Sequence, residues 1–210
     1  LLTTIAYRIN GKTTYAMEGS IFIAGAGVQW LRDRMKFFKK APETEKIVKS
    51  LNNNNDIYLV PAFTGLGAPY WDANARGVLS GITRDTSPKE IVRATIEAVA
   101  YQTFDLFEAM KHDGLRPKIV KVDGGMVMNN WFSQFLSDIV NVKVLRPKVQ
   151  ETTALGAAFM AGLQIGVYKS LKDISKNWHL DKKFSPKMKN KSRSVLIKGW
   201  EKAVKRALIN

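Results

Sequence analysis

The chain has 210 residues, of which 45% are hydrophobic, and it contains no cysteine. This length and composition suit one large or two small globular domains, and the lack of cysteine excludes disulfides and thiolate metal sites. Thirty-three Lys and Arg against eighteen Asp and Glu give a net charge of +15, as in many nucleic-acid-binding proteins. The two histidines, His112 and His179, lie 67 residues apart, so no imidazole-based metal cluster is expected.

Much of the positive charge lies in residues 181–210, where ten Lys or Arg stand against Asp181 and Glu201, a balance of +8. Residues 185–194 are rich in Lys and Ser, which predicts an exposed loop or tail. No aromatic residue interrupts that segment to stack on bases, as single-strand binders require. We therefore expect a solvated lysine-rich surface rather than a nucleic-acid site, with one domain over residues 1–180 and a basic tail with a terminal helix over residues 181–210.

No segment of the sequence is typical of a membrane or secreted protein. The most apolar stretch, residues 153–168, is interrupted by Gln164 and is too short to span a bilayer. Residues 1–4 lack the basic region and the cleavage site of a signal peptide. We expect a cytoplasmic protein that does not bind membranes. Because the sequence does not begin with Met, we also expect a piece of a longer chain.

Short runs typical of strands alternate along the chain with longer runs of helical spacing. In chain order these runs predict strands over residues 3–9 and 13–17, helices over 21–38 and 43–51, strands over 57–60 and 78–82, a helix over 88–110, a strand over 118–122, a helix over 131–140, a strand over 142–145, and helices over 154–166 and 195–208. Asn10-Gly11 is a strong hairpin turn, and Ser87 before Pro88 is a typical helix start. The order indicates an α/β domain with a basic C-terminal helical appendage.

The most informative run is Asp123-Gly124-Gly125, which joins the strand at 118–122 to the helix at 131–140. A strand that breaks on two glycines and restarts as a helix exposes backbone N–H groups, and a phosphate or nucleotide binds readily there. A side chain at Gly125 would keep such a ligand from the backbone. On the residues alone, an ordinary strand–turn–helix connection is the more common explanation.

Several motifs together resemble the glycerol kinases of the carbohydrate kinase family. The matching segments are residues 60–72 (VPAFTGLGAPYWD), 75–77 (ARG), Gly77, Leu79, Gly81 and Ile82, Glu90 and Ile91, 94–97 (ATIE), 123–125 (DGG) and 151–158 (ETTALGAA). The resemblance covers residues 1–185 and fades in the tail. It implies the C-terminal domain of two, with the actin-like, ribonuclease-H-like ATPase fold, in which helices flank a mixed sheet.

In that family ATP lies in the cleft between the two domains. Carried over by position, the nucleotide contacts here are Gly25, Gln29, Gly125 and Asn129. Gly25 and Gln29 stand four residues apart and therefore share a helix face, where the glycine admits the nucleotide and the amide can bond its ribose or base. Asn129 follows Gly125 by four residues and can reach the same ligand. Without the resemblance, helix packing explains Gly25 and Gly27, and ordinary exposure explains Gln29.

The resemblance also implies the reaction, ATP plus glycerol to ADP plus glycerol 3-phosphate, with Mg²⁺. In the family the first phosphate loop, the glycerol contacts and the catalytic aspartate lie in the N-terminal domain, and the second phosphate loop would precede Leu1. We therefore expect no catalytic and no metal-ligating residue in this chain, and no activity without the N-terminal domain, which alone would contact glycerol. We expect the full-length protein to be a homo-oligomer. Asp123 could orient a magnesium-bound water or cap the glycine turn.

Two other functions remain open. The first is another sugar kinase of the same family, which assays on glycerol, xylulose and gluconate would separate. The second is a basic nucleic-acid-binding module with a vestigial nucleotide cleft, whose affinity would fall steeply with salt and survive the loss of Asn129.

Two further expectations concern packing. Glu97 and Asp105 lie eight residues apart, about 12 Å along a helix, so we expect packing or surface roles rather than a shared proton. The small-residue helix at 154–166 is expected to pack against the sheet near the cleft.

Overall fold

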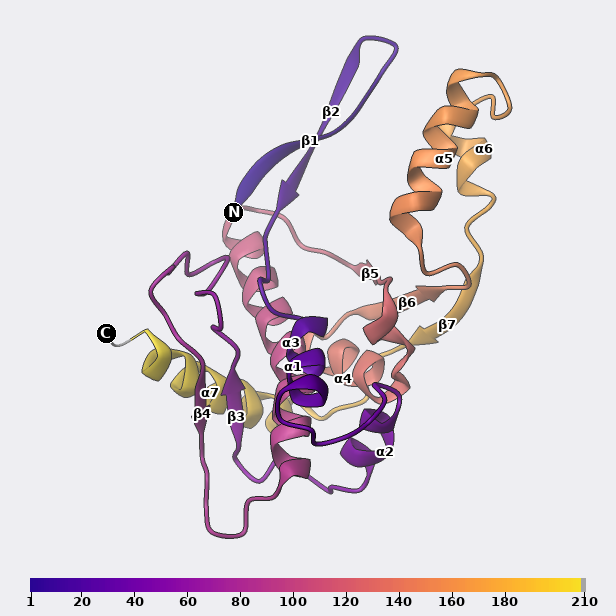
Figure 1. Ribbon diagram of the computed structural model, residues 1–210. Helices are drawn as coiled ribbons and strands as arrows, with labels where there is room; N and C mark the ends of the chain where they lie inside the picture. Colours follow the sequence, from indigo (N-terminus) through magenta and orange to yellow (C-terminus); the bar gives the residue numbers. More distant parts are fainter. Residues whose placement is uncertain (209–210) are drawn as a thin grey trace.

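The computed structural model describes residues 1–208. The long helix α3 (Pro88–His112) runs through the middle of the molecule, with the sheets and the other helices around it (Figure 1). The remaining elements, in chain order, are β1 (Leu2–Ile9), β2 (Lys12–Glu18), α1 (Gly25–Asp33), α2 (Glu43–Lys49), β3 (Tyr58–Val60), β4 (Val78–Ser80), β5 (Ile119–Lys121), the 3₁₀ helix η1 (Gly125–Met128), α4 (Asn130–Val140), β6 (Lys143–Pro147), α5 (Thr152–Gln164), α6 (Leu171–Ser175), β7 (Leu180–Phe184) and α7 (Asn190–Ala207). Among residues 1–208, no helix is long and apolar enough to cross a lipid bilayer.

The strands form three small sheets. β1 and β2 make the predicted hairpin, with Asn10 and Gly11 at positive φ in its turn. β3 pairs with β4 in an antiparallel ribbon. β6 lies between a parallel neighbour, β5, and an antiparallel neighbour, β7, so this sheet is mixed, as predicted. Helices flank the sheets in the α/β arrangement expected from the sequence (Figure 1).

α3 starts where the sequence predicts because its first turn is capped. The Ser87 hydroxyl accepts a hydrogen bond from the Lys89 N–H, and the Glu90 carboxylate accepts one from the Ser87 N–H. This reciprocal pair satisfies N–H groups that have no partner inside the helix. Along its length α3 packs against α1, α2, α4 and β3. The helix is therefore the shared wall of the core.

The first long helix is shorter than predicted. We expected residues 21–38, whereas α1 covers Gly25–Asp33 only. Tertiary contacts hold the preceding residues in a non-helical path: the Ser20 carbonyl accepts from the Ala68 N–H at 3.0 Å, and the Ile23 carbonyl accepts from the Gln102 amide at 3.4 Å. Beyond α1, Lys36 takes a left-handed backbone conformation, with φ of 59°, that ends any helix.

The basic segment is integrated into the fold over its described residues, 181–208. Its first residues belong to β7, and α7 places Trp200 in the core with no exposed surface. α7 begins at Asn190, five residues before the predicted start, and it buries one face while its lysines point outward. The boundary proposed after residue 180 therefore falls within a strand, and the segments on both sides share one hydrophobic core.

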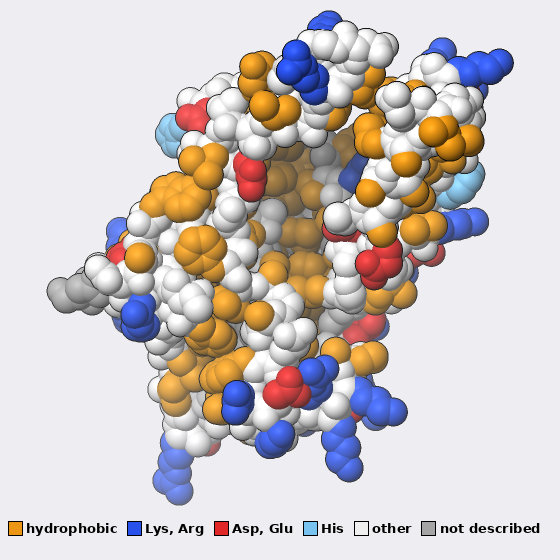
Figure 2. All heavy atoms as spheres, turned by 45° about the horizontal axis from the view of Figure 1, so that its top comes forward, with side chains coloured by type: hydrophobic (Ala, Val, Ile, Leu, Met, Phe, Trp, Pro, Cys, Tyr) orange, Lys and Arg blue, Asp and Glu red, His pale blue; other side chains and the backbone are white. Residues whose placement is uncertain are grey.

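The helix expected against the sheet lies elsewhere. α5 and α6 form an arm that extends from the mixed sheet (Figure 1), and apolar side chains on and after α5, such as Met160, Ile165 and Val167, are exposed. Apolar side chains also line a hollow between this arm and the rest of the molecule (Figure 2). The prediction of close packing for residues 154–166 was wrong because small residues alone do not select a packing partner.

The two carboxylates on α3 make separate structural contacts, as expected. The Asp105 carboxylate accepts from the Tyr70 hydroxyl and from the Trp200 indole, each at 2.8 Å. It thereby ties the loop after β3 and the helix α7 to α3. Burial raises the pKa of Asp105 from its ordinary 3.8 to about 6, although the hydrogen bonds from Trp200 and Tyr70 oppose the change.

We predict that Asp105→Asn flattens the pH dependence of stability. Because the folded-state pKa of Asp105 lies above its unfolded value, the proton it binds stabilises the fold fully below pH 3.8, and this contribution is lost as the pH rises through about 6. Between pH 4 and pH 7 the loss amounts to about 2 kcal/mol. Urea unfolding at both pH values should show this difference between the wild type and the variant. The same pH dependence in both proteins would contradict the assignment.

A second prediction concerns Gly199 in α7. A Cβ at this position would stand 2.2 Å from the Tyr58 hydroxyl oxygen and 2.3 Å from its ring carbon. Gly199→Ala should therefore lower the free energy of unfolding by about 1–3 kcal/mol, despite the better helix propensity of alanine. Gly156→Ala in α5 is the matched control, because nothing lies within 4 Å of its Cβ. Denaturation should show no loss for the control, and an equal loss in both variants would refute the steric explanation.

Candidate functional site

The four residues predicted to contact a nucleotide line one pocket. Its volume is ≈ 340 Å³, and Gly25 and Gln29 face it from α1 while Gly125 and Asn129 face it from η1 and the start of α4. Residues of α2 and the loop before it form a third wall, and Ile96 of α3 contributes to the lining. This volume lies within the range of small-molecule sites, about 300–1,000 Å³. The structure thus brings together residues as distant in the sequence as Gly25 and Asn129, which are 104 positions apart.

The glycines of α1 have different surroundings. A Cβ at Gly27 would lie 3.0 Å from a methyl carbon of Thr95, so this glycine serves the packing of α1 on α3. A Cβ at Gly25 would meet nothing within 4 Å. Helix packing therefore explains Gly27 and not Gly25. Gly25 leaves backbone open toward the pocket, as a nucleotide contact requires.

A 3₁₀ helix lies between the glycine pair and α4, whereas the sequence predicted a direct restart as a helix. Gly124 has a φ of 82°, which a residue with a side chain rarely adopts. The chain continues as the 3₁₀ helix η1 before α4 begins at Asn130. A Cβ at Gly125 would again meet nothing within 4 Å. The backbone N–H groups at the pocket therefore belong to a short 3₁₀ turn rather than to the first turn of α4.

Asn129 has a structural role as well as a place in the pocket. Its Oδ1 accepts from the Phe132 N–H at 3.0 Å, which makes it the N-cap of α4, and its Nδ2 donates to the Thr44 hydroxyl at 3.4 Å. The sequence carried a signal for the cap, since Asn directly before an apolar helical run is a typical N-cap. A substitution at Asn129 thus affects the helix start and the pocket together.

Sequence reasoning missed the wall formed by α2. Thr44 and Glu45 line the pocket, and the Glu45 carboxylate accepts from the Asn130 N–H at 3.3 Å and pairs with Lys49 at 2.5 Å. Partial burial acts to raise the pKa of Glu45, but the hydrogen bonds from Lys49 and Asn130 outweigh it and hold the pKa below its ordinary value. Arg32 and Met128 also line the pocket. No local pattern marked these residues, because their place depends on how α1, α2 and α4 meet.

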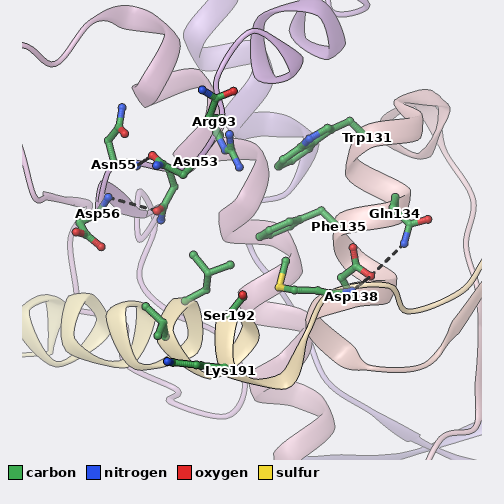
Figure 3. A pocket seen from close by; sticks show the side chains of 15 residues that line it. Asn53, Asn55, Asp56, Arg93, Trp131, Gln134, Phe135, Asp138, Lys191 and Ser192 are labelled. Carbon is green, nitrogen blue, oxygen red and sulfur yellow. Dashed lines mark hydrogen bonds between the residues drawn. The ribbon is translucent and has the colours of Figure 1, made fainter.

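A larger groove lies on the side of α4 that faces α7 (Figure 3). Its volume is ≈ 830 Å³, and none of the four predicted residues lines it. Polar groups along it bond to one another: the Gln134 amide donates to Asp138 at 3.1 Å, and Asp138 also accepts from the backbone N–H groups of Lys187 and Met188. At the edge of the groove, the guanidinium carbon of Arg93 lies over the Trp131 ring, 5.0 Å from the ring centre. The contacts of Asp138 link α4 to the loop that precedes α7.

Metal-binding groups are sparse. Within residues 1–208, no three His, Asp or Glu side chains are placed to hold a metal ion together. Asp123, beside the glycine turn, accepts a hydrogen bond from the Thr152 hydroxyl. This hydrogen bond joins the residue before the glycine turn to the start of α5.

The mixed sheet and the flanking helices are those of the actin-like fold of carbohydrate kinases. The model for the C-terminal domain of the FGGY family of carbohydrate kinases matches residues 3–165, and the chain belongs to this family. It is 56% identical over 206 residues to glycerol kinase 1 of Pseudomonas aeruginosa, and 54% identical over 209 residues to the glycerol kinase of Thermoanaerobacter pseudethanolicus. These alignments cover 98% and 99% of the chain but 42% of each relative, so the chain spans less than half the length of the curated relatives it matches.

Solved structures give the same result. The glycerol kinase of Plasmodium falciparum with ADP superimposes with a TM-score of 0.89 at 39% identity, over 100% of this chain and 42% of that one. The xylulose kinase of Lactobacillus acidophilus superimposes with a TM-score of 0.76 at 24% identity, over 95% of this chain and 40% of that one. The chain is thus similar to the C-terminal portion of glycerol kinases, and the likeness to the xylulose kinase shows the fold alone. The comparisons fit the prediction of a glycerol kinase fragment. They fit neither of the two alternatives, which were another sugar kinase and a nucleic-acid-binding module.

We predict that the capping role of Asn129 can be separated from its place in the pocket. Asn129→Ala removes the cap of α4 and should cost about 1 kcal/mol of stability. Asn129→Ser retains a hydroxyl that can accept from the same N–H, so its stability should stay close to that of the wild type. Urea unfolding of the three proteins tests this difference. Equal losses in both variants would show that the contact with Thr44, rather than the cap, is what stabilises this end of α4.

Proposed function

We propose that this chain is the nucleotide-binding half of a glycerol kinase, which transfers a phosphoryl group from ATP to glycerol and forms ADP and glycerol 3-phosphate. The observation that carries the proposal is the pocket in which Gly25, Gln29, Gly125 and Asn129 meet. Two of these residues are glycines whose missing side chains leave open space on facing walls. The similarity to glycerol kinases over nearly the whole chain supports the same assignment.

Each of the four residues has a role in this proposal. Gly125 offers a backbone N–H to a phosphate oxygen at the start of a 3₁₀ turn, where such groups have no partner within the helix. Gly25 allows the nucleotide to lie against α1, and the exposed Gln29 amide bonds the ribose or the base. Asn129 borders the same space at the start of α4. The net charge of +15 favours the approach of an anionic nucleotide.

Magnesium enters the proposal with the nucleotide. Mg²⁺ in kinases is commonly held by substrate phosphates and one or two carboxylates rather than by an all-protein cage. Asp123 directly precedes the glycine turn in the sequence, and in this proposal it orients a magnesium-bound water rather than binding the ion itself. When bound, the ion neutralises charge on the phosphates during transfer. The residues of this chain hold and orient the nucleotide.

We further propose that catalysis requires the N-terminal kinase domain, which would supply the carboxylate that accepts the proton of the glycerol hydroxyl. Apolar residues on the hairpin, such as Ile5 and Tyr15, and on the arm, such as Met160, are exposed, and a hollow lined by apolar side chains lies on the same face (Figure 2). An apolar surface of this kind is typical of an interface. The whole enzyme would act in the cytoplasm as a homo-oligomer, and the isolated chain would be inactive.

Calorimetric titration with Mg-ADP tests the nucleotide site. Half of an interdomain site should retain about 4–6 kcal/mol of binding, a Kd of roughly 0.05–1 mM. Gly125→Ala places a methyl group in the pocket where nothing else lies within 4 Å, so we expect at least about tenfold weaker binding with unchanged stability. Gly156→Ala, outside the pocket, should bind as the wild type does. Equal binding by both variants would overturn the site.

The same protein tests the reaction. The chain alone should phosphorylate neither glycerol, xylulose nor gluconate, whereas the N-terminal domain of a related glycerol kinase added in trans should restore activity on glycerol. Activity of the chain alone would contradict the division of labour between the two domains. No activity on glycerol from the reconstituted pair, although the added domain is folded, would contradict the assignment to a glycerol kinase.

A further inference from the structure

Arg146 on β6 is a buried cation beneath the wall of the nucleotide pocket. Its side chain is only 7% exposed. The guanidinium donates to the Val127 carbonyl at 2.8 Å and to the Met128 carbonyl at 3.4 Å, both in η1. It also donates to the Asn130 side-chain oxygen at 3.3 Å. One side chain thus contacts three residues of the segment that carries the two proposed ligands, Gly125 and Asn129.

These contacts matter because the turn has little stability of its own. Glycine loses more conformational freedom on folding than any other residue, and η1 follows one glycine, Gly124, and begins with another, Gly125. A 3₁₀ helix of four residues has poorer hydrogen-bond geometry than an α-helix, and its last carbonyls have no partner within it. Arg146 donates to two of those carbonyls, and one of them, that of Val127, also accepts from the Ser133 hydroxyl of α4 at 2.9 Å. An external donor therefore fixes the direction in which the Gly125 N–H and the Asn129 side chain point.

Asp181 on β7 holds the arginine in place. Its carboxylate accepts from Arg146 Nε at 2.7 Å, so the two remaining nitrogens of the planar guanidinium face the turn. The Asp181 side chain is 41% exposed, in contrast to the buried Arg146. Neither residue lines the pocket. The basic C-terminal segment therefore reaches this region through Asp181 and the arginine it orients, and directly through Lys182, whose ammonium donates to the Asn130 side-chain oxygen at 3.2 Å.

We propose that Arg146 and Asp181 are positioning residues for nucleotide binding: Asp181 orients Arg146, and Arg146 fixes the 3₁₀ turn that presents Gly125 and Asn129. This inference rests on the proposed nucleotide site. It requires arginine specifically, because the three nitrogens of a guanidinium reach acceptors in a fixed fork, whereas the ammonium group of lysine is a single point of charge. It differs from a general stabilising role because three of the four acceptors lie within residues 127–130.

Hydrogen–deuterium exchange tests the positioning without any ligand. In Arg146→Met, the amides of residues 125–130 should exchange at least about tenfold faster, the loss expected for charge-assisted hydrogen bonds, while amides of α3 and α7 keep their rates. Arg206→Met is the control, because Arg206 donates to the Ser80 hydroxyl at the end of β4, in a different sheet. Its loss should leave the exchange of residues 125–130 unchanged. Unchanged exchange at 125–130 in Arg146→Met, or equal acceleration throughout the chain, would overturn the proposal. If Arg146→Met does not fold, Arg146→Lys takes its place, with the same outcomes.

Mg-ADP titration tests the link between the two residues. Arg146→Met should weaken binding by about tenfold, and Asp181→Asn by about threefold. Asp181→Asn should have no further effect in the Arg146→Met background, because Asp181 acts through the arginine. Additive losses would overturn that order of action, and unchanged affinity in Arg146→Met would overturn the positioning role. If the wild-type chain binds no Mg-ADP, the proposed nucleotide site fails, and the exchange rates alone decide whether Arg146 orders the turn.

Discussion

A buried ion pair on α3 holds the elements around the pocket in register. The Arg93 guanidinium donates to Glu97 at 2.7 Å, Glu97 has no exposed surface, and Tyr101 donates to its second oxygen at 2.9 Å. Burial raises the pKa of Glu97, and the arginine and the tyrosine counteract that change. Arg93 also donates to the Leu51 carbonyl after α2 and lies over Trp131 in the first turn of α4. Loss of one partner would leave a buried charge uncompensated, at a typical cost of about 3–5 kcal/mol, and would loosen two of the pocket's three walls.

Local signals predicted most of the elements, and tertiary contacts determined where some of them end. The start of α3 was predictable because Ser87 and Glu90 form its cap within four residues. The true start of α1 was not, because the path of the preceding residues depends on a hydrogen bond from Ala68, nearly fifty residues away. The basic composition of residues 181–210 predicted an appendage, yet the fold uses the apolar face of α7, with Trp200 at its centre, to complete the core.

The residues of the site also fall into two groups, those that the sequence marked and those that only tertiary contacts place. Gly25, Gln29, Gly125 and Asn129 were predicted from the family resemblance, and the glycine turn at the end of a strand and the helical spacing agreed with it without being sufficient alone. No local sequence pattern marked the pocket wall formed by α2 or the contacts of Arg146 with the turn at residues 127–130. Both depend on residues that lie far apart in the sequence. The pocket is therefore a product of the packing around α3: residues that can contact a nucleotide are placed by others that do not touch it.

The most direct test of this account is a map of backbone amide resonances during titration of the chain with Mg-ADP. The account predicts that the perturbed amides cluster at residues 25–32, 41–45 and 124–130, the three walls of the smaller pocket. Perturbations centred on the larger groove at residues 52–56 and 188–196, or spread over the lysines of α7, would contradict it. In the first case the nucleotide would occupy a different cavity, and in the second it would bind to the basic surface by charge alone.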